Sequence, residues 1–139
     1  MGLGLGEAVG AAVARPDSLT VAVIGDGGLL MSLGELDSIV AQRVPLLILI
    51  MNDHAYGPEV EALERHGLPT TLSLFHEVDF AAIARGVGAE SFTLRTVEEL
   101  GRVRDWLQNP TAPLVVDCKI DPLFRSRQTE AAQMAAGRA

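Results

Sequence analysis

Two short apolar runs, at residues 20–24 and 46–51, each lead into a polar segment, and this pairing constrains the fold more than any other feature. The first run is followed by Gly-Asp-Gly-Gly at 25–28, and the second by Asn-Asp-His-Ala-Tyr-Gly at 52–57. Short continuous apolar runs are typical of parallel strands that are buried on both faces. Ligands of open parallel sheets bind outside the carboxyl ends of the strands. The two polar segments therefore predict one binding site.

The rest of the chain alternates between helical and strand patterns. Helices are expected at 2–14, from Ser32 to the exit at Pro45, at 57–65, from Asp79 to Gly88 and from Thr96 to Pro110, and further strands at 91–94 and 114–120. Alternating strands and helices predict an α/β fold, with a parallel sheet, helices on both faces and right-handed crossovers.

Three helix starts have capping residues. Ser32 with Glu35, and Thr96 with Glu99, match the capping-box spacing, in which each side chain of the pair satisfies a backbone amide at the helix start. Asp79 is expected to cap the helix that follows it. These signals predict where the helices begin.

Composition limits the class of protein. A chain of 139 residues with 48% hydrophobic and 21% charged residues fits one packed domain, which we expect at 1–120, with a polar, alanine-rich tail at 121–139. The net charge of −7 argues against nucleic acid or an anionic membrane as a general partner. The sequence has no signal-peptide pattern and no apolar run of membrane-spanning length, so a cytoplasmic protein is the default expectation.

The residues after the two strands are oxygen donors. Asp26 supplies a carboxylate, Asn52 a neutral amide oxygen, and a backbone carbonyl at His54 lies two residues further on. Magnesium prefers such oxygen ligands, completed by phosphates and water. A lone Gly-Asp-Gly after a strand is more often a structural turn. The paired arrangement favours a metal site, because two strands, both ligands and the spacing must coincide.

Glycines beside the acid favour a phosphate ligand. Gly27 and Gly28 lack a Cβ, so a diphosphate can approach their amides closely. The helix expected to start at Ser32 lies just beyond, and helix N-termini favour anions. A diphosphate held through Mg²⁺ is the ligand class that this pattern predicts.

These motifs resemble the C-terminal, diphosphate-binding domain of thiamine-diphosphate (ThDP) enzymes, in the group of acetolactate synthases and 2-keto-acid decarboxylases. The resemblance covers roughly residues 1–120 and rests on the Gly-Asp-Gly at 25–27, on Asn52 and on the segment Met-Gly-Leu-Gly at 1–4. The first Asn of the family's Asn pair is replaced by Met51. The family's domain usually begins about one strand and one helix earlier, so the domain looks truncated at its N-terminal side.

The resemblance implies a set of site residues. Asp26, Asn52 and the backbone oxygen of His54 would bind Mg²⁺, and Met1 corresponds to the methionine that supports the bent cofactor. The residues implied to bind the cofactor are Met1, Gly25, Asp26, Gly27, Gly28, Asn52, His54, Ala55, Tyr56 and Gly57.

The resemblance also implies what the chain lacks. In the family, a glutamate on a pyrimidine-binding domain, usually of a partner subunit, activates the cofactor, which then attacks a 2-keto acid. No glutamate here matches that motif, so no catalytic residue is assigned. A homo- or hetero-oligomer such as a dimer is expected, with the chain as one part or one subunit of a carboligase or decarboxylase.

Two other functions remain possible from the sequence. One is a non-catalytic remnant or interaction module that keeps the fold without turnover. The other is a generic nucleotide-binding domain, which is disfavoured because neither G-x-G-x-x-G nor G-x-x-x-x-G-K-[ST] occurs.

Overall fold

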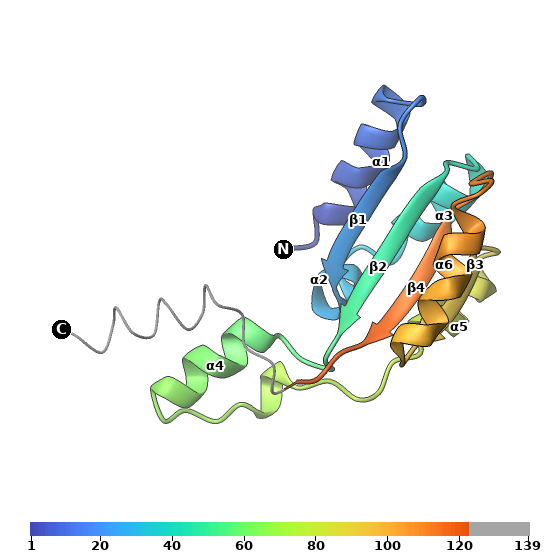
Figure 1. The fold of residues 1–139 in the computed structure, drawn as a ribbon. Helices are drawn as coiled ribbons and strands as arrows, with labels where there is room; N and C mark the ends of the chain where they lie inside the picture. The colour runs from blue at the N-terminus through green and yellow to red at the C-terminus, as the bar shows by residue number, and fades with distance from the viewer. Residues whose placement is uncertain (123–139) are drawn as a thin grey trace, which may run out of the picture.

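The structure, a computed structural model, describes residues 1–122 and contains a four-stranded parallel sheet. The strands are β1 (Thr20–Gly25), β2 (Leu46–Asn52), β3 (Glu90–Leu94) and β4 (Leu114–Lys119), arranged in the order β1-β2-β4-β3 (Figure 1). All three strand pairs are parallel. The predicted parallel α/β fold is confirmed. The predicted tail at 121–139 lies, except for its first two residues, outside the described part.

The expected helices appear in the predicted order, with one further short helix, α2 (Asp26–Leu30), that the sequence did not predict. The helices are α1 (Gly4–Ala14), α2, α3 (Glu35–Ala41), α4 (Gly57–Arg65), α5 (Phe80–Gly86) and α6 (Leu100–Trp106), with 3₁₀ turns η1 (Thr71–Ser73) and η2 (Val97–Glu99). Figure 1 shows α4 beyond the carboxyl ends of β2 and β4, away from the other helices. Within residues 1–122, no helix combines the length and the apolar character needed to cross a membrane.

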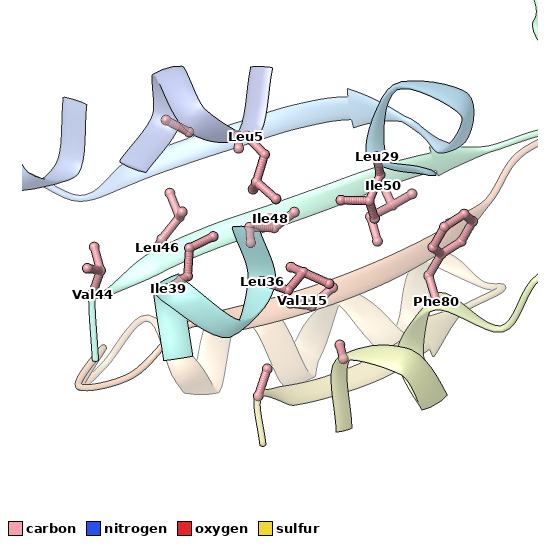
Figure 2. Packing of buried hydrophobic residues seen from close by; sticks show 14 of the residues in the cluster. Leu5, Leu29, Leu36, Ile39, Val44, Leu46, Ile48, Ile50, Phe80 and Val115 are labelled. Atoms are coloured by element: carbon pink, nitrogen blue, oxygen red, sulfur yellow. The ribbon is translucent and has the colours of Figure 1, made fainter. Parts of the chain in front are cut away.

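Most of the core lies on one face of the sheet. Side chains of α1, α2, α3 and α5, among them Leu5, Leu29, Leu36 and Phe80, form one buried cluster with β2 and β4 (Figure 2). Removing such apolar surface from water stabilises a domain by roughly 25 cal/mol per Å². This cluster includes residues of β1 and β2, the two strands whose carboxyl ends lead to the predicted ligands.

The second face is covered in part. Phe92 on β3 and Val116 on β4 are buried there, with Val103 and Trp106 of α6 packed against them. Helices therefore lie on both faces, as predicted. On β1, which is an edge strand, Val21 and Val23 keep 48% and 61% of their surface exposed.

The predicted helix starts were right in two cases of three. The Asp79 carboxylate accepts a hydrogen bond from Ala82 N at 2.8 Å, and the Glu99 carboxylate accepts one from Thr96 N at 3.0 Å. The expected helix start at Ser32 was wrong, because α2 begins directly after β1 and α3 begins at Glu35. The Ser32 hydroxyl points backward, donating to the carbonyl of Gly28 at 3.3 Å. The anion-favouring helix N-terminus expected there is absent.

Candidate functional site

The two predicted side-chain ligands lie on neighbouring strands. In the β1–β2 register Gly25 pairs with Met51, so Asp26 and Asn52 leave the sheet at the same level. Both residues are buried, with 2% and 1% of their surface exposed. Burial of two adjacent polar residues requires compensating contacts, and the two obtain them very differently.

Only one of the two carboxylate oxygens of Asp26 has a hydrogen-bond partner among the described residues. Its Oδ1 accepts a hydrogen bond from Gly27 N at 2.8 Å, whereas its buried Oδ2 has no hydrogen-bond partner among the described residues. Burial raises the pKa of the Asp26 carboxyl, opposed by the backbone amides of Gly27, His54 and Ala55, and the charge of Asp53 raises it further. An ionised carboxylate here has an oxygen that remains available to a ligand.

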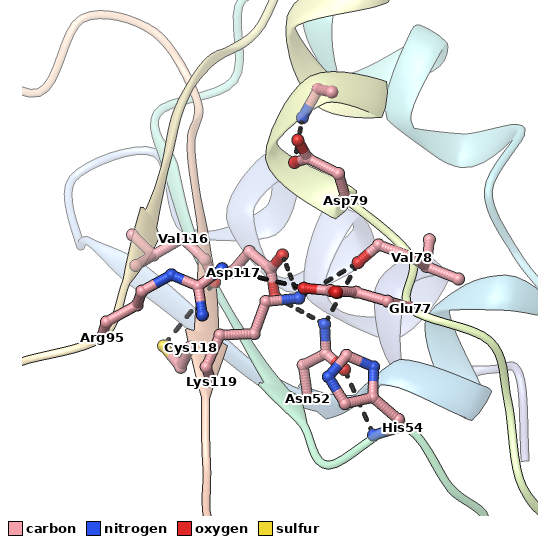
Figure 3. A network of polar contacts seen from close by, with 11 residues as sticks. Asn52, His54, Glu77, Val78, Asp79, Arg95, Val116, Asp117, Cys118 and Lys119 are labelled. Carbon is pink, nitrogen blue, oxygen red and sulfur yellow. Dashed lines mark hydrogen bonds and ion pairs between the residues drawn. The ribbon is translucent and has the colours of Figure 1, made fainter.

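Asn52 uses both ends of its amide. Its Nδ2 donates to Asp117 Oδ1 at 2.8 Å and to the carbonyl of Val78 at 3.5 Å (Figure 3). Its Oδ1 accepts a hydrogen bond from His54 N at 3.3 Å. An amide oxygen has two lone pairs, and this contact uses one of them.

His54 adopts an unusual backbone conformation. Its φ is +61°, in the left-handed region, which few non-glycine residues occupy. The segment at 73–75 holds it there, because Phe75 N donates to the His54 carbonyl at 2.7 Å and Tyr56 N donates to Ser73 O at 2.9 Å. The carbonyl predicted as the third metal ligand is therefore fixed in place and already accepts one hydrogen bond.

The two glycines after Asp26 have different surroundings. A Cβ on Gly27 would lie 2.5 Å from Cδ1 of Tyr56 and 3.2 Å from Cζ of Phe75, whereas a Cβ on Gly28 would meet nothing within 4 Å. Tyr56 and Phe75 pack edge to face, with ring centroids 4.5 Å apart. The ring of Tyr56 therefore covers Gly27 and leaves Gly28 open.

A pocket of about 690 Å³ lies over the end of β1. Eight of the ten predicted cofactor residues line it, namely Met1, Gly25, Asp26, Gly27, Gly28, Ala55, Tyr56 and Gly57. The other two, Asn52 and His54, are not part of its lining. The charged residues that line it are Glu7, Asp26 and Glu59, with no lysine or arginine among the described lining residues.

Residues 1–122 contain no cluster of three His, Cys, Asp or Glu side chains that resembles a metal site. The predicted set has a single carboxylate and otherwise neutral oxygens, so it differs from such clusters in composition. The sequence reasoning also missed Asp117, which is fully buried beside Asn52. An aspartate within the apolar run 114–118 was the available signal, because a charge in a buried strand needs a partner.

Comparisons with known proteins identify the family of the chain. The family model for the "Thiamine pyrophosphate enzyme, C-terminal TPP binding domain" matches residues 1–118. A putative acetolactate synthase large subunit of Mycobacterium tuberculosis is 31% identical over 88% of this chain and 22% of its own length. A probable pyruvate decarboxylase of Schizosaccharomyces pombe is 28% identical over 87% of this chain and 21% of its own.

A solved structure shows the same fold. The thiamine diphosphate-dependent 4-hydroxybenzoylformate decarboxylase of Rhodococcus jostii superposes with a TM-score of 0.81 at 26% identity, over 87% of this chain and 23% of that one. The chain thus spans about a fifth of the length of the relatives named here. Because the family model covers most of its length, the chain belongs to the family of C-terminal TPP-binding domains of thiamine pyrophosphate enzymes.

Proposed function

We propose that the chain binds the diphosphate of ThDP through a Mg²⁺ ion, as the C-terminal part or a subunit of a 2-keto-acid carboligase or decarboxylase of the acetolactate synthase type. The observation that carries this proposal is the buried Asp26 Oδ2, which has no hydrogen-bond partner within residues 1–122 and lies in a pocket whose described lining contains no lysine or arginine. Glu7, Asp26 and Glu59 would repel a diphosphate unless a bound cation offsets their negative charge.

The residues present fit Mg²⁺. Asp26 would contribute the unpartnered carboxylate oxygen, and Asn52 and His54 would contribute neutral oxygens that each retain a lone pair. Magnesium binds through one or two protein carboxylates together with substrate phosphates and water. Cofactor phosphates would complete this set, which explains why the protein needs only one charged ligand here.

The remaining pocket residues would shape the cofactor site. The open side of Gly28 would give a diphosphate close access to the backbone, and Ala55, Tyr56 and Gly57 line the same pocket. The bound thiazolium would supply the electron sink for the chemistry. The chain's own residues would anchor and orient it.

The catalytic machinery would be completed elsewhere. We assign no catalytic residue to this chain and propose that a pyrimidine-binding domain or subunit supplies the activating glutamate, so that the working enzyme is an oligomer. The substrate would be a 2-keto acid, in line with the names of the relatives. The cofactor-binding unit would be residues 1–120, with 121–139 as its tail.

Calorimetry tests this proposal directly. ThDP is titrated, with and without Mg²⁺, into the chain combined with a matching pyrimidine-binding chain. We expect binding only with Mg²⁺, and none with thiamine, which lacks the diphosphate. Absence of Mg²⁺-dependent binding by the mixture, with the fold intact by circular dichroism, would contradict the proposal. Failure of the isolated chain alone would not contradict the proposal, because the proposed pyrimidine-binding partner would supply part of the pocket.

One observation favours a second candidate, a non-catalytic module that keeps the fold. The Tyr56 ring occupies the space over Gly27 that a diphosphate would otherwise approach. Release of carbon dioxide from a 2-keto acid, on mixing the chain with its pyrimidine-binding partner and ThDP, would exclude this candidate. Mg²⁺-dependent binding without any turnover would support it.

A further inference from the structure

A buried polar network lies directly behind Asn52. Asp117 is fully buried and accepts a hydrogen bond from Asn52 Nδ2 through its Oδ1 at 2.8 Å. Its Oδ2 forms an ion pair with Lys119 Nζ at 3.1 Å, and Lys119 also donates to the carbonyl of Val78 at 3.1 Å (Figure 3). The Lys119 side chain is only 12% exposed. The network therefore places a charged pair in the interior, next to a predicted ligand.

These contacts permit only one orientation of the Asn52 amide. Asp117 Oδ1 and the Val78 carbonyl only accept hydrogen bonds, so the group that faces them must be Nδ2. His54 N only donates, so the group that faces it must be Oδ1. Burial raises the pKa of the Asp26 carboxyl, and the backbone amide of His54 acts in the opposite direction. The amide oxygen of Asn52 thus faces the backbone amide of His54, the residue whose carbonyl is the third predicted ligand.

We propose that Asp117 and Lys119 are a positioning pair, whose role is to keep the oxygen of Asn52, rather than its nitrogen, facing the metal position. This inference rests on the proposed Mg²⁺ site, in which Asn52 Oδ1 is a ligand. Neither residue of the pair is a catalytic residue. Both act through Asn52.

The choice of a carboxylate at position 117 follows from this role. A neutral amide there could turn either end toward Asn52, whereas a carboxylate offers acceptors on both sides and cannot donate. Burying a carboxylate is unfavourable unless it is paired and hydrogen-bonded, and Lys119 provides the pairing. Partners behind a metal ligand orient it, and their loss typically lowers metal affinity by about 10–100-fold.

The variant Asp117→Asn tests the orientation. Two donors, Asn52 and Lys119, would then compete for one oxygen at position 117. The cationic Lys119 should win, because hydrogen bonds to charged groups are the stronger ones. The amide nitrogen introduced at position 117 would then face Asn52 and force its amide to turn, so we expect affinity for Mg²⁺ alone to fall by about 10-fold or more.

The double variant Asp117→Asn with Lys119→Met provides the rescue. Without Lys119, the amide oxygen introduced at position 117 is free to face Asn52. The Mg²⁺ affinity should therefore return to within about threefold of wild type. This loss is much smaller than the roughly 10–100-fold loss that is typical when a residue behind a metal ligand is removed. Asp105→Asn is the matched control, since Asp105 is a surface acid with a side chain that is 76% exposed. It should change neither affinity nor the network.

NMR gives a readout that does not depend on metal binding. In the wild-type chain, the Asn52 side-chain NH₂ protons should exchange slowly and resonate downfield, because they donate to a buried carboxylate. Asp117→Asn should abolish this signature and the double variant should restore slow exchange. Mg²⁺ affinity follows from the shifts of backbone amides around Asp26 during titration.

The outcomes separate the two proposals. Unchanged Mg²⁺ affinity in Asp117→Asn, or equal losses of Mg²⁺ affinity in the single and double variants, would overturn the positioning role. Neither result would contradict the metal site. A wild-type chain that does not respond to Mg²⁺ but shows the protected Asn52 amide would overturn the positioning role and leave only the orientation of the amide, whereas the metal site itself is tested by the calorimetry of the mixture with ThDP. An unprotected amide in wild type would overturn the network, even if the variants fail to fold.

Discussion

Asp26 and Asn52 leave neighbouring strands at the same level and are equally buried, yet their hydrogen bonding differs. Asn52 contacts three groups, namely His54 N, Asp117 Oδ1 and Val78 O, whereas Asp26 Oδ2 has no hydrogen-bond partner among residues 1–122. A satisfied buried polar group contributes to the fold, and an unsatisfied one destabilises it. The contrast indicates that contacts within the fold already hold the Asn52 side chain, whereas one oxygen of Asp26 is not engaged by the described residues.

The largest expected effect comes from Asp26→Asn, which removes the negative charge of the carboxylate that has an unpartnered oxygen. We expect Mg²⁺-dependent ThDP binding to weaken by at least about 100-fold, more than the loss of a residue behind a ligand causes. The free energy of unfolding should stay equal or rise, because an unpaired buried charge is gone. Calorimetry and urea denaturation measure the two quantities. Asp37→Asn, an exposed acid on α3, serves as the control.

Normal binding by Asp26→Asn would remove Asp26 from the metal site. A clear loss of stability in the same variant would show that its second oxygen is satisfied in the folded protein, and the contrast with Asn52 would then fail.

Asn52→Ala removes the side-chain amide that is already hydrogen-bonded within the fold. Asp117 Oδ1 and the Val78 carbonyl would lose a buried donor, so the free energy of unfolding should drop by about 2 kcal/mol, within the usual range for an orphaned buried group. Urea denaturation measures the loss. If Asn52→Ala were as stable as the wild type, water or rearrangement would be replacing the contact, and Asn52 would not be part of the fixed framework.

Gly27→Ala tests the environment of the amide that bonds to Asp26. The added methyl group would collide with the Tyr56 ring, so we expect a loss of about 1 kcal/mol, at the low end for overpacking because the partly exposed ring can swing away. Gly28→Ala is the matched control and should lose no stability, since its methyl group meets nothing within 4 Å. Equal effects at both positions would show that Tyr56 does not rest on Gly27.

The smallest expected effect is a pH dependence that only Asp26 can produce, since Asn52 does not titrate. Burial raises the pKa of Asp26 above its ordinary value of 3.8, so the folded state holds this proton more tightly than the unfolded state. The resulting stabilisation is present at low pH and is lost as pH rises through the folded-state pKa. The unfolding free energy of wild type minus that of Asp26→Asn should therefore increase as pH falls from 7 toward 4. A flat difference in urea denaturation would contradict this.

The sequence predicted the larger elements because their signals are local. Apolar runs at 20–24 and 46–51 required buried strands, and Asp79 and Glu99 cap helix starts through bonds within their own turns. The same reasoning failed at Ser32. There the chain continues from β1 directly into α2, so the serine lies within a series of turns, and its hydroxyl bonds backward to Gly28.

The site was predictable only as a set of residues. The motif after each strand identified Asp26 and Asn52, and the parallel register that brings them level follows from strand neighbours, which the sequence left open. The ring of Tyr56 over Gly27 and the carboxylate of Asp117 behind Asn52 join segments far apart in the chain. No local pattern encodes such contacts.

The amino-acid sequence alone predicted the fold class and the family, both of which are confirmed, and it proposed the oxygen ligands, because hydrophobic periodicity and strand-end motifs lie in short, contiguous stretches. Packing decided which donors are already engaged. Which end of the Asn52 amide faces His54 depends on β4 and on Val78, which the fold brings to the end of β2. One oxygen of Asp26 has no hydrogen-bond partner among the described residues. Burial makes those distant partners matter, since water can no longer satisfy either side chain.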